Sequence, residues 1–246
     1  AQALGRQGLG RFLQRGRVED RHGTAGVEPV GAQRQHAFGR PLHEHQHVVA
    51  VAVQRAHARA LGIEVGDFVS FDPRVEVING FVKSRHLDDK AAVANLLAAI
   101  KALHDNGLKP REGTCLLFSN YEEVGLGGSS DFPESMEELL TVDMAAIGEG
   151  QTSDEFHASI CVKDRGGPYH HEFSNKLRDL AAAYEIPVKV DIYVNYSSDG
   201  KAYWHAGGHA AVALIGPGVD SSHHYERTHT DALVDTTRWI LAYLLS

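Results

Sequence analysis

Apolar runs that alternate with helical segments from residue 83 onward constrain the fold of this chain more than any other feature. The runs at 114–120, 138–147, 188–195 and 209–218 predict buried strands, and the segments at 91–106, 172–185 and 233–245 predict helices. Continuous apolar runs are typical of strands that are covered on both faces. Strands in alternation with helices therefore predict an α/β fold built on a mostly parallel sheet.

The chain before residue 83 has a different character. Residues 1–52 are rich in Arg, His and Gly, glycine interrupts every candidate element, and no fold is predicted for them. Residues 53–82 alternate apolar and polar positions between turn signals such as Asn79-Gly80, a pattern that predicts short antiparallel strands. Lysine is absent before Lys83. We therefore expect three segments, 1–52, 53–82 and 83–246.

Composition excludes several classes of protein. The chain of 246 residues carries a net charge of −8, which argues against a nucleic-acid partner. No apolar run is long enough to span a membrane, and no secretory signal is recognisable. Cys115 and Cys161 are the only cysteines and favour a reducing compartment over a disulfide framework. We expect a cytoplasmic protein without a membrane or nucleic-acid partner.

Acidic side chains and one histidine follow successive predicted elements. Open α/β sheets bind their ligands at the carboxyl ends of the strands, so side chains at these positions are expected to meet. Carboxylates together with imidazole are the donor set for zinc, cobalt or manganese. The candidates are Asp88, Asp89, Glu122, Glu123, Asp143 and His223.

Each candidate also has a plainer interpretation. Asp88 or Asp89 could cap the helix that follows, and the Glu122–Glu123 pair could form a solvated turn. A single histidine is more often a surface or core residue than a ligand. Asp143 is harder to explain structurally, because an unpaired buried carboxylate costs several kcal/mol. The joint arrangement, with one candidate at each strand end, favours a metal site.

A hydrolase with two metal ions would explain the adjacent charges of Glu122 and Glu123. One carboxylate would bind a metal, and its neighbour would act as general base on water. Two ions about 3.5–4 Å apart also need a bridging carboxylate.

The motifs resemble a known family. SRHLDDKAAVANLLAAIKAL, SNYEEVGLGGS, VDMAAIGEG, KDRGGP, EFSNKLRDLAAAYEIP, YSSDGKAY and GGHAAVALIGPG are similar, in this order, to the catalytic domain of the glutamyl and deblocking aminopeptidases, also called tetrahedral aminopeptidases. The resemblance implies a three-layer α/β/α phosphorylase/hydrolase-like sandwich, with the metallopeptidase catalytic domain at 83–246 and the trailing strands of an inserted small β-barrel domain, as its remnant, at 53–82. It further implies a peptide or amide substrate, two divalent ions (Zn, or Co or Mn) and a homo-oligomer between dimer and dodecamer.

The resemblance also implies roles for individual residues. Asp88 would bridge the metals, and its peptide bond to Asp89 would be cis. Glu122 would be the general base and Glu123 a ligand of one metal. The remaining ligands would be Asp143 for the other metal and the family's last histidine, His223. Asp199 matches a family aspartate to which we assign no role.

Two departures from the family pattern affect these expectations. The family's Arg-Tyr-x-His-Ser type of motif is replaced by SSHHYERTHTDAL, which leaves His229 as a rival to His223. The family's upstream His-x-Asp strand is not recognisable. The alternate residues His43, His45 and His47 are a weak substitute, so one metal site is expected to be incomplete and the chain inactive as it stands.

Three functions remain open at the level of sequence. The leading one is a dinuclear metal-dependent aminopeptidase with Glu122 as general base. The second is a deacylase or amidohydrolase of an N-blocked small peptide or amino acid on the same fold, suggested by HHYERTH. The third is a non-catalytic oligomerising homologue, suggested by the absent upstream histidine.

Overall fold

The structure is a computed structural model that describes residues 55–246. The chain divides into two compact units, one of which contains Arg74–Ser246. The described residues of the other unit, 55–73, form the helix α3 (Arg55–Ala60) and no strand. The prediction of strands throughout 53–82 is therefore wrong for 55–73, because 55–60 are helical and 61–73, whose side chains are mostly exposed, form no strand with the described residues. The assignment of this segment to an inserted domain stays a prediction.

A mixed sheet forms the centre of the larger unit. Its strands follow the order β3 (Glu138–Val142), β8 (Ala211–Val219), β5 (Ala158–Asp164) and β6 (Gly167–Pro168). β7 (Val188–Ile192) also pairs with β5, and β4 (Ala145–Ala146) continues beside β8. β3 and β8 run parallel, with Val142 opposite Ile215, whereas β5 is antiparallel to β8. The carboxyl ends of β3 and β8 therefore meet at one edge of the sheet.

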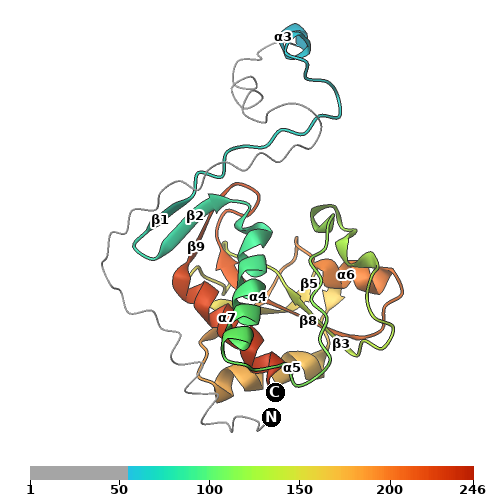
Figure 1. Ribbon diagram of the computed structural model, residues 1–246, viewed down its shortest axis with the longest axis vertical. Coiled ribbons are helices and arrows are strands. Elements are labelled where there is room, and N and C mark those ends of the chain that lie inside the picture. The colour runs from blue at the N-terminus through green and yellow to red at the C-terminus, as the bar shows by residue number, and fades with distance from the viewer. Residues whose placement is uncertain (1–54) are drawn as a thin grey trace. The chain divides into compact units, whose positions relative to one another are not determined.

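Helices cover both faces of this sheet, as predicted. One apolar core joins the strands to α4 (Leu87–Asp105), α5 (His171–Ala183) and α7 (Thr230–Leu244). A second core joins the opposite face to α6 (Asp199–His205) through Tyr203. α4 and α7 pack side by side in front of the sheet, whereas α6 lies apart from them (Figure 1). The three-layer α/β/α arrangement is confirmed.

A small antiparallel sheet lies beside the start of α4. It consists of β1 (Glu76–Ile78), β2 (Phe81–Arg85) and β9 (Tyr225–His229) in that order. The turn between β1 and β2 uses Asn79 and Gly80 with φ of 52° and 80°, as expected for a two-residue hairpin loop. A side chain at Gly80 would collide with the ring of His229. This sheet connects the start of α4 to the segment that follows β8.

The predicted strand at 114–120 is not present. These residues belong to no strand, and Leu116, Leu117 and Phe118 are 39%, 37% and 45% exposed. A strand needs hydrogen bonds to a neighbour, and no strand among the described residues pairs with this segment. The segment leads into two 3-10 turns, η1 (Glu122–Val124) and η2 (Gly127–Ser129).

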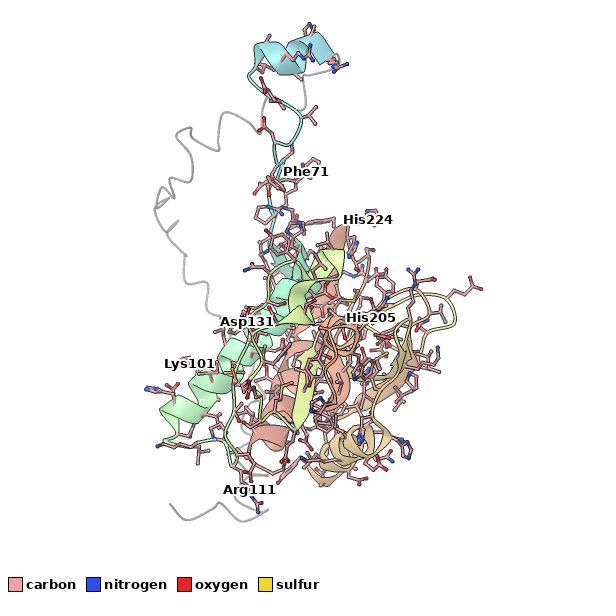
Figure 2. The ribbon with its side chains drawn as sticks, turned by 90° about the vertical axis from the view of Figure 1, so that its right-hand side faces the viewer. Phe71, Lys101, Arg111, Asp131, His205 and His224 are labelled. Atoms are coloured by element: carbon pink, nitrogen blue, oxygen red, sulfur yellow. The ribbon has the colours of Figure 1, made fainter. Side chains whose placement is uncertain are left out.

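The outward faces of the helices are polar. Lys101 on α4 points away from the molecule (Figure 2) and pairs with Asp105 one turn later, at 2.8 Å between Nζ and Oδ2. None of the helices in the described part of the chain combines the length and the apolar character needed to cross a membrane.

Candidate metal centre

Four segments bring the predicted site residues to the edge of the sheet where β3 and β8 end. Asp88 lies at the start of α4, and Glu123 lies in η1. Asp143 directly follows β3, and His223 lies between β8 and β9. These residues line one open cavity of about 550 Å³ together with Glu122. The rule that strand ends meet at a common edge accounts for Asp143 and His223, which follow β3 and β8, whereas Glu123 follows no strand and Asp88 follows β2 of the small sheet.

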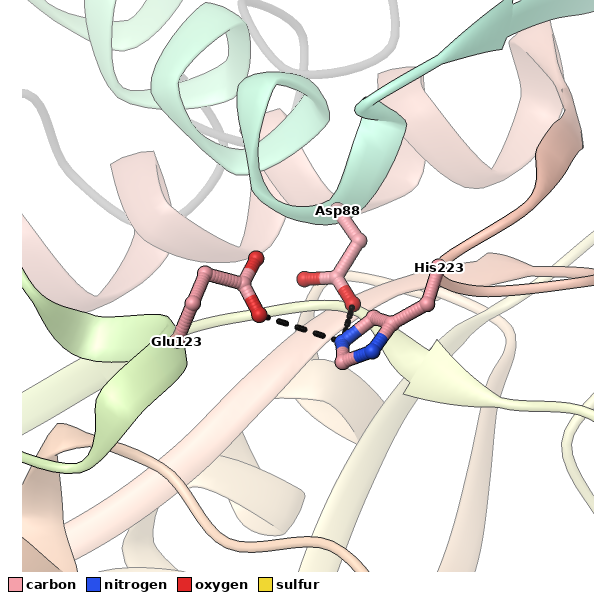
Figure 3. A group of neighbouring side chains, drawn as sticks. All are labelled: Asp88, Glu123 and His223. Carbon is pink, nitrogen blue, oxygen red and sulfur yellow. Dashed lines mark ion pairs between the residues drawn. The ribbon is translucent and has the colours of Figure 1, made fainter. Parts of the chain in front are cut away.

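Asp88, Glu123 and His223 form the first group of possible ligands. The Nε2 atom of His223 lies 3.1 Å from Oε2 of Glu123 and 3.4 Å from Oδ2 of Asp88 (Figure 3). One ligand atom from each residue lies within 4.8 Å of the others. Two carboxylates and an imidazole that face one another form a donor set of the kind that binds zinc.

A second group consists of Asp88, Asp89 and Asp143, whose carboxylate oxygens also lie within 4.8 Å of one another. Asp88 is therefore a member of both groups, which is the arrangement that a bridging carboxylate requires. Its peptide bond to Asp89 is cis, in agreement with the family resemblance. Ser222, whose part in the site is not evident from the sequence, donates a hydrogen bond of 2.6 Å to Oδ2 of Asp88.

Burial and mutual repulsion raise the pKa values of Asp89, Glu123 and Asp143. For Asp143, burial is the largest cause, followed by the charges of Asp88 and Glu122, and its pKa lies well above the usual range. Burial and the charge of Asp143 act in the same way on the pKa of Asp89. Burial and Asp88 also raise the pKa of Glu123, although His223 opposes this rise. The cluster is therefore electrostatically unfavourable when its carboxyl groups are ionised.

Divalent cations fit this site. The donor atoms are carboxylate oxygens and one imidazole nitrogen, and a divalent charge would offset the repulsion among the acids. Oδ1 of Asp89 is buried and has no hydrogen-bond partner, as expected for an atom left free for a ligand. The residues that would hold the ions are Asp88, Glu123 and His223 in one group and Asp88 and Asp143 in the other, with Asp89 beside them.

Glu122 lies beside these groups without being a member of either. Burial raises the pKa of its carboxyl group to about 7, and the charges of Asp199 and Glu123 contribute. Oδ2 of Asp199 accepts a hydrogen bond of 2.5 Å from Ser119, which lies three residues before Glu122 in the sequence. This contact holds Asp199 close to Glu122. An acid whose pKa lies near neutrality suits proton transfer at neutral pH.

His229 lies away from both groups and has structural contacts. Its side chain accepts a hydrogen bond from the backbone N–H of Asp231 and caps α7. Its ring packs against Phe81 and Phe156, with centroids 5.0 Å and 4.8 Å apart. Among the two candidate histidines, only His223 faces the carboxylates. His43, His45 and His47 lie outside the described residues.

The sequence of the whole chain was compared with known families. The profile of the M42 glutamyl aminopeptidases matches residues 13–238, which is most of the chain. The chain belongs to the M42 glutamyl aminopeptidase family. This confirms the family that the motifs indicate.

Individual relatives of this M42 chain agree with the family match. The Bacillus subtilis (strain 168) protein "Putative aminopeptidase YhfE" is 49% identical over 193 residues, which are 78% of this chain and 56% of that protein. The TET1 peptidase of Pyrococcus horikoshii shares 24% identity at a TM-score of 0.64, over 77% of this chain and 57% of its own. An aminopeptidase from the archaeon Desulfurococcus kamchatkensis shares 21% identity at a TM-score of 0.67, over 77% and 56%. The two structures support the fold, and the M42 chain spans little more than half the length of these relatives.

The carboxyl cluster is expected to make the metal-free M42 chain less stable as the pH rises toward neutrality. The pKa of Glu122 is about 7 in the folded protein and 4.5 ordinarily, so the folded state binds more protons between these values. The folded state is therefore more stable when Glu122 is protonated than when it is ionised. This stabilisation is fully present below pH 4.5 and is lost as the pH rises to 7. Because Glu122 is only partly buried, solvent screens this effect, and the loss is about 1–2 kcal/mol, or roughly 2–8 °C in Tm for a chain of this size.

Thermal unfolding of the metal-free protein at pH 5 and pH 7.5 measures this effect. We expect the lower Tm at pH 7.5 and a larger gain from Zn²⁺ at that pH, because the cation offsets the ionised carboxylates. A Glu122→Gln variant serves as the control and should show a smaller difference between the two pH values. A Tm that rises from pH 5 to pH 7.5 in the metal-free wild type would contradict the burial of repelling carboxyl groups.

Proposed function

We propose that this chain provides the catalytic centre of a dinuclear metal-dependent aminopeptidase. The observation that carries the proposal is the sharing of Asp88 between two ligand groups, with Glu122 beside them and outside both. This is the division of tasks that a two-metal hydrolase needs, with a bridging carboxylate and a separate base. Membership in the M42 family supports the same reaction.

Six residues of the site have distinct tasks in this proposal. When bound, divalent ions polarise the scissile carbonyl and make water a better nucleophile. Glu122 accepts a proton from the attacking water and returns it to the leaving amine. Glu123 and His223 hold one side of the centre, Asp143 holds the other, and Asp88 connects them. Ser222 keeps the Asp88 carboxylate in place through its hydrogen bond.

Homo-oligomers are part of the proposal. The Pyrococcus horikoshii TET1 peptidase can assemble into a tetrahedron or a large octahedral shell. Another solved structure, that of PhTET1-12s, contains a dodecamer. We propose a closed homo-oligomer of the same type for the protein to which these residues belong.

The substrate of the proposed aminopeptidase is a short peptide.

The test, made on the full-length protein to which these residues belong, is hydrolysis of aminoacyl amides and of their N-acetylated counterparts after addition of Zn²⁺, Co²⁺ or Mn²⁺. We expect metal-dependent cleavage of the substrates with a free amine and little cleavage of the blocked ones. Preference for the blocked substrates would instead assign the site to a deacylase. Bound metal without cleavage of either substrate would contradict a hydrolase.

A further inference from the structure

Glu226 is a buried carboxylate to which the proposed reaction gives no task. It lies in β9 opposite Ser84 of β2 and is only 1% exposed. A buried charge is costly unless hydrogen bonds compensate for it. Its side chain lies at the wall of the cavity that contains the ligand groups.

The two oxygens of Glu226 contact two different segments of the site. Oε2 accepts a hydrogen bond of 2.9 Å from the backbone N–H of Asp88. Oε1 accepts a hydrogen bond of 2.9 Å from the backbone N–H of His223. One rigid, planar carboxylate therefore joins the backbones of two proposed ligand residues that are far apart in the sequence.

The backbone at these positions needs such support. His223 has a φ of 67°, in the left-handed region that residues other than glycine rarely adopt, and its hydrogen bond to Glu226 helps to stabilise this conformation. Asp88 lies in the first turn of α4, where backbone N–H groups have no partner within the helix. Glu226 supplies the acceptor in both places.

We propose that Glu226 is a positioning residue that sets the spacing between Asp88 and His223 and thereby raises the affinity of the centre for a divalent cation. The proposal rests on the proposed metal centre. Glu226 does not itself belong to either group of possible ligands. It acts through the main chain of two of them.

The test compares Glu226→Gln with Asp191→Asn in the full chain. Glutamine keeps one acceptor oxygen but directs an NH₂ donor at the second backbone N–H, so one of the two contacts is lost. Asp191 is a suitable control because it is also buried, at 7% exposure, and accepts backbone N–H groups at 2.8 Å, here from Thr152 and Ser153. Both variants remove one negative charge and one acceptor from a buried site.

Three measurements separate positioning from general stability. The Zn²⁺ affinity, measured against a chelating dye, is expected to fall about 10–100-fold in Glu226→Gln, the range for outer partners of metal ligands. The visible spectrum of bound Co²⁺ is expected to change with the ligand geometry. In the metal-free protein, hydrogen exchange at the amides of Asp88 and His223 should become faster. Asp191→Asn should leave all three unchanged even if its Tm falls.

A folded Glu226→Gln variant with the affinity and the Co²⁺ spectrum of the wild type would overturn the proposal. If Glu226→Gln does not fold, Glu226→Asp takes its place, because it keeps the charge but is too short to reach both N–H groups. Wild-type affinity in Glu226→Asp would likewise overturn it. Failure of the wild type to bind metal would refute the proposed function, while hydrogen exchange still tests whether Glu226 positions the two backbones.

Discussion

Replacing Glu122 by Gln is expected to lower kcat of the metal-loaded enzyme by about 10²–10⁴-fold, the usual contribution of a general base. Glutamine has nearly the same shape as glutamate but cannot accept the proton of the attacking water. Since Glu122 belongs to neither ligand group, the variant should keep its metal content. Steady-state kinetics on an aminoacyl amide, together with metal analysis of the same sample, measure both quantities.

Glu149→Gln is a suitable control for the Glu122 variant. Glu149 is exposed and does not line the site cavity. Its variant should retain the kcat of the wild type. A Glu122→Gln enzyme that keeps its kcat would refute Glu122 as the base, and one that loses metal together with activity would show that Glu122 is a ligand instead.

Replacing His223 by Ala is expected to weaken Zn²⁺ binding by more than about 100-fold, because a direct ligand contributes more than an outer partner does. The Nε2 atom of His223 faces the carboxylates of Asp88 and Glu123, and alanine offers no donor atom. His229→Ala should show the opposite pattern. It removes the cap of α7 and is expected to cost about 0.5–2 kcal/mol of stability without a change in Zn²⁺ affinity.

Isothermal titration with Zn²⁺ and thermal unfolding of both histidine variants test this contrast. Weak Zn²⁺ binding in His229→Ala with normal binding in His223→Ala would exchange the roles of the two residues. The sequence alone could not decide between them, because both follow β8 in a polar stretch. The register of β9 favours His223, since it places His229 opposite Phe81.

Most of the long elements of the fold are predictable because each one buries many apolar side chains, although the buried strand β5 is not among the predicted runs. α4, α5 and α7 show continuous helical patterns, and the run in β8 is buried over most of its length. These patterns are local properties of the sequence. The layered α/β fold follows from them.

Shorter or more polar elements were not predictable from local patterns. α6 spans less than two turns, which is too short for helical periodicity to be recognised. β9 has the polar sequence YERTH and forms a strand because it pairs with β2. The opposite holds at 114–120, where an apolar run predicts a strand but no strand within residues 55–246 pairs with it. At β9 and at 114–120, strand pairing with distant residues decides the local structure.

The candidate site was predictable as far as it depends on strand ends. Asp143 and His223 follow β3 and β8, whose carboxyl ends meet as the topology of an α/β sheet requires. Glu123 lies beside His223 although no strand precedes it. Glu226 could not be identified in this way, because its importance depends on hydrogen bonds to two backbone groups rather than on its position after a strand.

Anomalous X-ray scattering from crystals of the Zn²⁺-loaded protein tests the central claim most directly. The account predicts a zinc peak at coordination distance, about 2.0–2.2 Å, from a carboxylate oxygen of Asp88, a carboxylate oxygen of Glu123 and Nε2 of His223. A second peak should share Asp88 and contact Asp143. Zinc bound elsewhere in an active sample, for example at His229, with no peak between Asp88, Glu123 and His223, would contradict it.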